Sequence, residues 1–139
     1  MKSLHASGFL INDLKSDNVL LIIVNGSIRA KIIDFGHATF QNQQAYVYRL
    51  SEEEKRRYVH EGLYRHVAPE VALDGEQPTT KSDIFQVGQI LKKMGHVLKL
   101  DLLYVLGSSC CHDDPTMRPT LDHVITTLKG SGADRRVAI

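Results

Sequence analysis

The sequence predicts a mainly α-helical fold of the α+β class, in which helices pack around a buried central helix and a small β-hairpin lies at one edge. Two β-branched apolar runs flank an Asn-Gly-Ser turn in residues 19–33, which is typical of a hairpin. Residues 84–94 are apolar on more than one helical face, as in a helix that is buried nearly all round. Residues 121–128 have apolar side chains at positions i, i+3, i+4 and i+7, which predicts an amphipathic helix.

The composition indicates one soluble domain. A chain of 139 residues with 42% hydrophobic and 24% charged residues can bury a core, and we expect this domain over residues 1–130, followed by a polar tail at 131–139. The net charge of +1 gives no reason to expect nucleic-acid or membrane binding. The adjacent Cys110 and Cys111 indicate a reducing compartment, and no signal pattern or bilayer-length apolar run is present. We therefore expect an intracellular, cytoplasmic protein.

The first elements bring polar side chains together. Residues 1–7 read as the end of a helix that stops at Gly8. The hairpin follows, with strands at 19–24 and 28–33. Because a hairpin brings its outer ends together, Asn18 and Asp34 are predicted to lie side by side at its open end. Two oxygen ligands there could hold a hard cation such as Mg²⁺, with waters and phosphate completing the coordination.

Three motifs occur in a characteristic order: Asp13-Leu14-Lys15-x-x-Asn18, Asp34-Phe35-Gly36 and Ala68-Pro69-Glu70. Each is weak alone, but in this order, with a hairpin between the first two, they resemble the signature of the protein-kinase C-terminal lobe. The resemblance covers about residues 4–128. It implies a partial protein kinase domain that transfers a phosphoryl group from Mg-ATP to a protein Ser or Thr hydroxyl once an N-terminal lobe completes it.

The resemblance also implies roles for the motif residues. Asp13 would accept or orient the proton of the substrate hydroxyl, and Lys15 would neutralise charge on the transferring phosphoryl group. Asn18 and Asp34 would ligate Mg²⁺, and together with Lys15 they would hold the ATP. A lysine at position 15 resembles serine/threonine kinases more than tyrosine kinases. The alternative interpretation is a polar turn before a strand.

Two positions of the catalytic loop depart from the family pattern. Where the family has His-Arg-Asp, this chain has Ile11-Asn12-Asp13. Isoleucine can fill the apolar position of the imidazole ring but cannot hydrogen-bond. Loss of the arginine removes the cation that pairs with a phosphorylated activation loop in many kinases, so that form of switching is not expected. Leu63 also replaces a family threonine that bridges the catalytic aspartate and lysine.

Residues 37–67 resemble an activation segment, and they contain candidate phosphoacceptors at Tyr46, Tyr48, Ser51, Tyr58 and Tyr64. Ser51 followed by Glu54 predicts a capped, solvated helical turn, with a regulatory phosphosite as the alternative interpretation. After this segment, Pro69 is expected in the first turn of a short helix that ends near residues 74–75.

The central helix is expected to begin at Thr80-Lys81-Ser82-Asp83, which has the spacing of a capping box. The resemblance implies that Asp83 hydrogen-bonds the backbone of the catalytic loop, and a plain acidic N-terminal cap is the alternative. After Gly95 the chain is predicted to pass almost directly into another apolar helix at 98–106.

The C-terminal part carries a further motif of the resemblance, Cys110 followed by Asp114-Pro115-x-x-Arg118-Pro119-Thr120. It implies a bidentate ion pair between Arg118 and Glu70. A zinc site at residues 110–112 is disfavoured because three consecutive residues cannot converge on one tetrahedral ion, and the other histidines suggest no site. Thr120 is predicted to cap a final helix that ends at Gly130.

No glycine-rich phosphate loop, Val-Ala-x-Lys strand or helix with a partner glutamate is recognisable, so we expect the β-rich N-terminal lobe to be absent. This chain alone is therefore expected not to be a competent kinase. One alternative is a catalytically inactive kinase-like fragment that binds a partner protein, such as the missing lobe or a full-length kinase. Self-association through an exposed helical face around residues 84–94 belongs to that alternative. A third interpretation is that the sequence is part of a longer product.

Overall fold

A computed structural model describes residues 1–41, 43 and 49–130. Its elements in chain order are α1 (Lys2–Ala6), β1 (Phe9–Leu10), the 3₁₀ turn η1 (Ser16–Asn18), β2 (Val19–Val24), β3 (Ser27–Ile32), β4 (Thr39–Phe40), α2 (Glu52–Glu61), α3 (Pro69–Ala72), α4 (Thr80–Leu98), α5 (Asp101–Cys110), the 3₁₀ turn η2 (Pro115–Met117) and α6 (Leu121–Gly130). The predicted tail at 131–139 and the candidate phosphoacceptors Tyr46 and Tyr48 lie outside the described residues.

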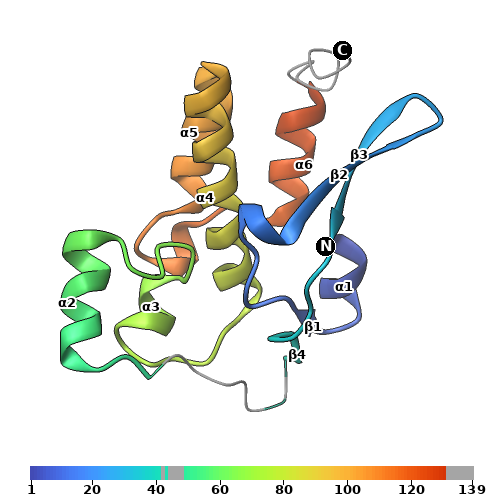
Figure 1. Cartoon of the computed structure of the whole chain (residues 1–139). Helices are drawn as coiled ribbons and strands as arrows, with labels where there is room; N and C mark the ends of the chain where they lie inside the picture. Colours follow the sequence, from blue (N-terminus) through green and yellow to red (C-terminus); the bar gives the residue numbers. More distant parts are fainter. Residues whose placement is uncertain (42, 44–48, 131–139) are drawn as a thin grey trace.

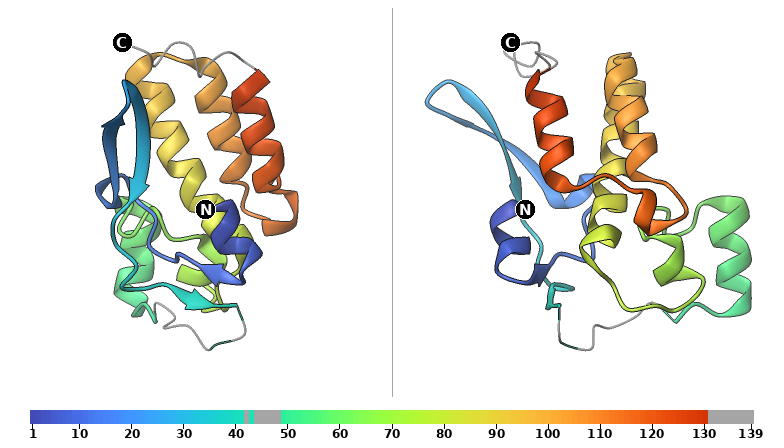
Figure 2. Two further views of the ribbon diagram at one scale, coloured as in Figure 1. Left: turned by 90° about the vertical axis from the view of Figure 1, so that its right-hand side faces the viewer. Right: turned by 180° about the vertical axis from the view of Figure 1, so that it is seen from behind.

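The fold is mainly helical, which confirms the predicted class. Figure 1 shows α4 and α5 standing side by side, with α6 next to them and with α2 and α3 near the base of α4. The β2–β3 hairpin projects away from the helices, as Figure 1 and the right view of Figure 2 show. Within the described residues, no helix is long and apolar enough to cross a membrane.

The two small sheets belong to the N-terminal part of the chain. Strands β2 and β3 pair antiparallel from Val19 opposite Ile32 to Val24 opposite Ser27, which confirms the hairpin. Its turn consists of two residues, because Asn25 (φ 51°) and Gly26 (φ 76°) both adopt the left-handed conformation that a tight hairpin turn requires. Strand β1 pairs with β4, where the rings of Phe9 and Phe40 lie edge to face at 4.6 Å between centroids.

Helix α4 divides the core into two clusters. Ile84 packs with residues of α5 and α6, and the cluster comprises Ile84, Leu91, Leu103, Leu106, Cys110 and Val124. Phe85, the next residue of α4, packs with the segment around α3, and this cluster comprises Val67, Ala68, Val71, Ala72 and Phe85. Both clusters therefore depend on the first half of α4, which is the predicted central helix.

The central helix begins at Thr80, as predicted, but its cap lies one residue earlier than expected and its C-terminal end lies beyond Gly95. The N-cap is Thr79 rather than Thr80: the Thr79 hydroxyl accepts from the Lys81 amide at 3.1 Å, and the Thr79 amide donates to the Ser82 hydroxyl at 2.8 Å. The helix also continues through Gly95, because α5 approaches it so closely that a Cβ on Gly95 would lie 2.5 Å from the Tyr104 amide nitrogen. Gly95 is therefore a packing residue and not a helix stop.

The expected burial of this helix holds for its first turns and decreases toward its C-terminal end, where Leu91 and Gly95 are still buried. Residues 82–86 are buried, whereas Met94, Val97 and Leu98 are 38%, 69% and 48% exposed. Ile84 is only 2% exposed. The exposed apolar surface predicted around residues 84–94 therefore lies toward the C-terminal end of α4.

The ion pair between Arg118 and Glu70 is confirmed and joins η2 to α3. Nη1 and Nη2 of Arg118 each lie 2.7 Å from a different carboxylate oxygen of Glu70, and Arg118 is 2% exposed. Arg118 also lies over the Phe85 ring at 5.0 Å from its centroid. The predicted caps of α2 and α6 are present as well, with Ser51 and Glu54 forming a capping box and Thr120 Oγ1 accepting from the His123 amide.

Candidate active site

The backbone of the loop between β1 and η1 is hydrogen-bonded to side chains in the first turns of α4. Asp83 is fully buried; its Oδ2 accepts from the Ile11 amide at 2.8 Å and its Oδ1 from the Asn12 amide at 2.9 Å. Gln86 accepts from the Leu14 amide and donates to the Asn12 carbonyl, both at 2.6 Å. The expected contact of Asp83 with the loop backbone is therefore confirmed, and the plain cap interpretation is wrong because Thr79 caps the helix.

The two substituted loop positions, Ile11 and Asn12, are both well integrated in the structure, one by burial and the other by hydrogen bonds. Ile11 is 1% exposed and fills an apolar position, as expected. Asn12 adopts a left-handed conformation (φ 64°), which asparagine tolerates better than most residues. Its Nδ2 donates to the His37 carbonyl at 2.8 Å and to Thr39 Oγ1 at 2.9 Å. Asn12 therefore ties the loop directly to the segment that follows Asp34-Phe35-Gly36.

Three of the predicted site residues converge. Asp13 is 4% exposed, and its carboxylate accepts from Lys15 Nζ at 3.2 and 3.0 Å. Asn18 Nδ2 donates to the Asp13 carbonyl at 2.8 Å and to Asp13 Oδ2 at 3.0 Å. A carboxylate that is nearly buried needs such partners to stay ionised. The structure thus brings Asp13, Lys15 and Asn18 into one hydrogen-bonded cluster.

A fourth residue of the cluster was missed from the sequence. His66 Nε2 lies 2.8 Å from Asp13 Oδ1, and His37 Nδ1 lies 3.8 Å from Asp13 Oδ2. His5 Nε2 lies 2.8 Å from Asp83 Oδ2. The prediction that these histidines suggest no site was therefore wrong. The available signal was the position of His66 two residues before Ala68-Pro69-Glu70, at the end of the segment that resembles an activation segment.

The pKa values of Asp13 and His66 follow from their burial and their mutual contact. Burial by itself raises the pKa of Asp13, but the hydrogen bonds and charges of Lys15 and His66 outweigh it and hold the pKa below its usual range. Burial lowers the pKa of His66, and the attraction of Asp13 offsets this only in part. At neutral pH an ionised Asp13 therefore accepts a hydrogen bond from the protonated Nε2 of a neutral His66.

Asp34 lies at the open end of the hairpin, where the chain leaves β3. The Ile33 amide donates to the Asn18 carbonyl at 3.1 Å, so Asp34 is the next residue after the backbone partner of Asn18. Asp34 is exposed, and its Oδ1 accepts from the Gly36 amide at 2.8 Å. Because the side-chain nitrogen Nδ2 of Asn18 donates to Asp13, the side-chain oxygen of Asn18 is the group that remains available to a cation.

The donor set fits Mg²⁺ only with help from a ligand. Two oxygen-bearing side chains at one end of a hairpin suit a hard cation that keeps several waters and bridges phosphates. Among the described residues, no group of three or more His, Cys, Asp or Glu side chains could hold a metal ion.

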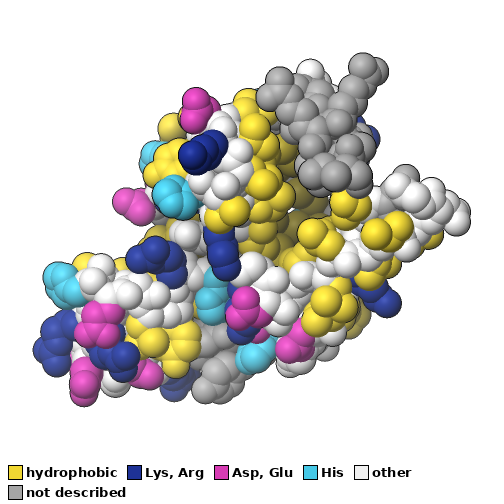
Figure 3. Space-filling model, turned by 45° about the horizontal axis from the view of Figure 1, so that its top comes forward, with side chains coloured by type: hydrophobic (Ala, Val, Ile, Leu, Met, Phe, Trp, Pro, Cys, Tyr) yellow, Lys and Arg dark blue, Asp and Glu magenta, His cyan; other side chains and the backbone are white. Residues whose placement is uncertain are grey.

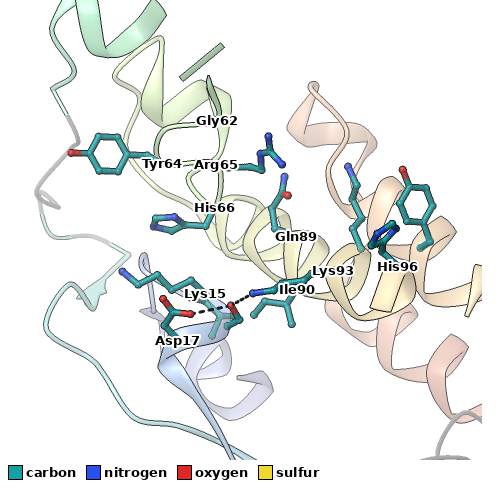
Figure 4. A pocket seen from close by; sticks show the side chains of 14 residues that line it. Lys15, Asp17, Gly62, Tyr64, Arg65, His66, Gln89, Ile90, Lys93 and His96 are labelled. Atoms are coloured by element: carbon teal, nitrogen blue, oxygen red, sulfur yellow. Dashed lines mark hydrogen bonds between the residues drawn. The ribbon is translucent and has the colours of Figure 1, made fainter. Parts of the chain in front are cut away.

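A cavity of about 830 Å³ opens beside Lys15. It is lined by Leu14, Lys15, Ser16, Asp17, Gly62, Tyr64, Arg65, His66, Gln89, Ile90, Lys92, Lys93, His96 and Tyr104. Figure 4 shows its walls, with the loop of Lys15 and Asp17 on one side, the segment of Arg65 and His66 on another, and Lys93 and His96 of α4 on a third. Four separate parts of the chain therefore build it.

Comparison with known proteins identifies relatives of this chain. The family model of the protein kinase domain matches residues 1–99. Two probable serine/threonine-protein kinases of Dictyostelium discoideum are similar, fnkE with 29% identity over 82% of this chain and 7% of its own length, and kinY with 28% identity over 93% and 26%. The mitogen-activated protein kinase HOG1 of Candida albicans is 34% identical over 68% of this chain and 21% of its own length. The chain thus spans about a quarter or less of each relative.

Proposed function

This chain belongs to the protein kinase family, and from that membership we propose that it forms the catalytic-loop half of a protein serine/threonine kinase. In this proposal, a phosphoryl group passes from Mg-ATP to a Ser or Thr hydroxyl of a protein, once an N-terminal lobe covers the nucleotide. The supporting observation is the cluster of Asp13, Lys15 and Asn18, joined by hydrogen bonds of 2.8 to 3.2 Å. Phosphoryl transfer depends mainly on positioning and charge stabilisation, which such a cluster provides.

Asp13 would orient the substrate hydroxyl. Its low pKa makes it a weak base, so holding the hydroxyl in line matters more than removing its proton early. Oδ2 of Asp13 is engaged by Asn18 and Lys15, and Oδ1 by His66. A substrate hydroxyl therefore has to displace His66 from Oδ1 or share that oxygen with it.

The remaining residues would serve the nucleotide. Asn18 and Asp34 would hold Mg²⁺, which neutralises charge on the phosphates when it is bound. Lys15, which lies within 3.2 Å of both Asp13 carboxylate oxygens, would place a positive charge next to the transferring group. Asn12 would keep the segment after Asp34 docked on the loop through His37 and Thr39, without any phosphorylated residue.

Isothermal titration calorimetry with Mg-ATP tests the proposal. We expect weak binding in the millimolar range for the whole chain, lost in Asp34→Ala and when Mg²⁺ is removed. Asp74→Ala, which changes another carboxylate outside the site, serves as the matched control and should bind as the unaltered chain does. Absence of heat at millimolar Mg-ATP would rule out ATP-dependent transfer by this chain.

A second candidate function is partner binding, including self-association, by a kinase-like lobe that does not catalyse. The observation that favours it is apolar exposure at one end of the α4–α5 pair, where Val97 is 69%, Leu98 48% and Val105 61% exposed. On the face drawn in Figure 3, hydrophobic side chains gather in the middle and along the projecting hairpin. Exposed apolar surface of this kind commonly marks an interaction site.

A further inference from the structure

Six of the fourteen residues that line the cavity beside Lys15 are basic and one is acidic; we call it the basic cavity. Its positively charged or protonatable members are Lys15, Arg65, His66, Lys92, Lys93 and His96, and its one acidic member is Asp17. Figure 4 shows Arg65 and Lys93 approaching the cavity from different elements. A concave site lined by one sign of charge concentrates its electric field and attracts ligands of the opposite sign.

Three cations of this cavity have no carboxylate partner within the described part of the chain, whereas Lys15 is paired with Asp13. There, Arg65, Lys92 and Lys93 form no salt bridge with a carboxylate. Lys93 Nζ instead donates to the Ser16 hydroxyl at 2.9 Å, and Lys92 Nζ lies over the Tyr104 ring at 5.9 Å from its centroid. Three cations that line one concave site without a carboxylate partner can be paired by an external anion.

Asp17, the acidic residue of the cavity, does not pair directly with these cations. Asp17 Oδ1 accepts from the Ser16 hydroxyl at 3.2 Å, and Ser16 in turn accepts from Lys93. The hydroxyl thus separates the carboxylate from the ammonium group. Lys93 is held in place by a neutral partner and keeps its full charge for a ligand.

The basic cavity also lies next to the proposed reaction centre. Lys15 and His66 line it, and both contact the Asp13 carboxylate. A polypeptide that placed a hydroxyl at Asp13 would pass directly beside the cavity. Its volume of about 830 Å³ is within the usual range of ligand pockets and can hold several side chains.

We propose that the basic cavity binds an anionic segment of a protein, one that carries Asp, Glu or phosphorylated residues near the hydroxyl that is to be modified. The placement of that hydroxyl rests on the proposed function, whereas binding of the anionic segment does not require catalysis. The proposal thus adds a substrate class, acidic or already phosphorylated peptides, to the site at Asp13.

Fluorescence anisotropy with the full chain, in the absence of nucleotide, tests this. Four labelled peptides of one length carry a central serine flanked by glutamate, by phosphoserine, by glutamine or by lysine. We expect the glutamate and phosphoserine peptides to bind at least tenfold more tightly than the glutamine peptide, with affinity falling as salt rises, and the lysine peptide not to bind. Equal binding of the glutamate and glutamine peptides would overturn the proposal.

Two double variants separate the cavity from general charge. Lys92→Gln with Lys93→Gln should weaken the glutamate peptide about tenfold, which corresponds to about 1.4 kcal/mol. Arg29→Gln with Lys31→Gln removes the same charge from exposed positions on β3 and should change affinity less than twofold. If both variants weakened binding equally, the effect would be one of net charge and the cavity would not be the site. Circular dichroism establishes that each variant is folded.

The nucleotide-free design keeps two failures apart. Selective binding of the anionic peptides by a chain that gives no heat with Mg-ATP would retain the cavity and remove the transfer reaction. Heat with Mg-ATP and no peptide selectivity would retain the transfer reaction and remove the cavity proposal.

Discussion

Asp13 shows how a nearly buried charge can be kept available for chemistry. The side chains of Lys15, Asn18 and His66 all reach its carboxylate, and together they offset the cost of taking it out of water. The same contacts make Asp13 a weaker base and place a histidine where a substrate hydroxyl would bind. At the scale of single residues, the site therefore holds Asp13 in a defined position, while His66 occupies the place where a substrate hydroxyl would bind.

Acid should destabilise the protein through His66 and then through Asp13. Both groups have a lower pKa in the folded protein than in the unfolded chain, so the unfolded chain binds more protons on acidification. Stability should therefore fall as the pH drops below about 6.5 for His66, and again below about 3.9 as the pH approaches the lower folded pKa of Asp13. Urea unfolding at pH 7.5 and 5.5 measures the first step, which His66→Gln should reduce.

The control for this experiment is His123→Gln, which alters an exposed histidine of α6. It should keep the full loss of stability between pH 7.5 and 5.5. An unchanged loss in His66→Gln would show that the burial of His66 does not set the acid sensitivity in that range.

The buried ion pair between Arg118 and Glu70 should matter far more than an exposed one. Glu70 is only 8% exposed. Arg118→Met leaves its carboxylate without the bidentate partner, which we expect to cost about 3–5 kcal/mol of unfolding free energy. Arg57→Met breaks the exposed pair with Glu61 on α2 and should cost far less, because water and salt screen exposed charges. Urea denaturation of both variants measures the difference, and similar costs would contradict this account.

At the scale of elements, the close approach of α4 and α5 depends on glycine. A Cβ on Gly88 would lie 2.6 Å from the Cβ of Cys110 and 2.7 Å from the carbonyl oxygen of Gly107, while one on Gly95 would meet the Tyr104 backbone. Glycine is a poor helix former, so Gly88, Gly95 and Gly107 lower the stability of the two helices. Close packing between the helices has to offset this cost. The helices can approach only because these positions lack side chains.

Gly88→Ala should therefore destabilise the protein by about 1–3 kcal/mol, although alanine is the better helix former. Gly130→Ala in α6 is the matched control: a Cβ there has nothing within 4 Å, and the change should be neutral or stabilising by up to about 1 kcal/mol. Thermal unfolding followed by circular dichroism measures both. A stabilised Gly88→Ala would show that the two helices are not held at this distance.

At the scale of the whole molecule, apolar surface remains uncovered at two places. The end of the α4–α5 pair exposes Val97 and Val105, and the projecting hairpin exposes Leu21 (70%) and Ile23 (78%). Figures 1 and 2 show that the hairpin extends away from the helical part. A folded domain with apolar residues exposed on two sides is expected to bind another surface.

We expect the chain to self-associate as its concentration rises, with light scattering giving a mass above the 15.6 kDa of one chain. Val97→Lys combined with Val105→Lys should shift the chain toward the monomer. Val59→Lys, at a valine of α2 that is also 61% exposed, should not. A chain that stays monomeric and binds no hydrophobic dye would exclude partner binding through this face.

Much of the fold follows from short-range patterns. The β2–β3 hairpin, the Ser51–Glu54 capping box and α6 all depend on residues a few positions apart, so the local sequence was enough to predict them. The ordered motifs were enough to predict that Asp13, Lys15 and Asn18 form one cluster, because these residues share one short loop. The shared role of Asn18 and Asp34 in binding Mg²⁺ stays a prediction.

Tertiary packing decided the rest. His66 reaches Asp13 across 53 residues, α4 runs through Gly95 because α5 lies against it, and the basic cavity combines a loop, the segment before α3, and two helices. No local pattern records such contacts, since a histidine or lysine has the same sequence signature whether it faces solvent or a buried carboxylate. By itself the sequence determined the family, the elements and the loop that carries the chemistry. What lies against that loop depends on which distant surfaces pack together, because burial and charge at a site are properties of the folded chain.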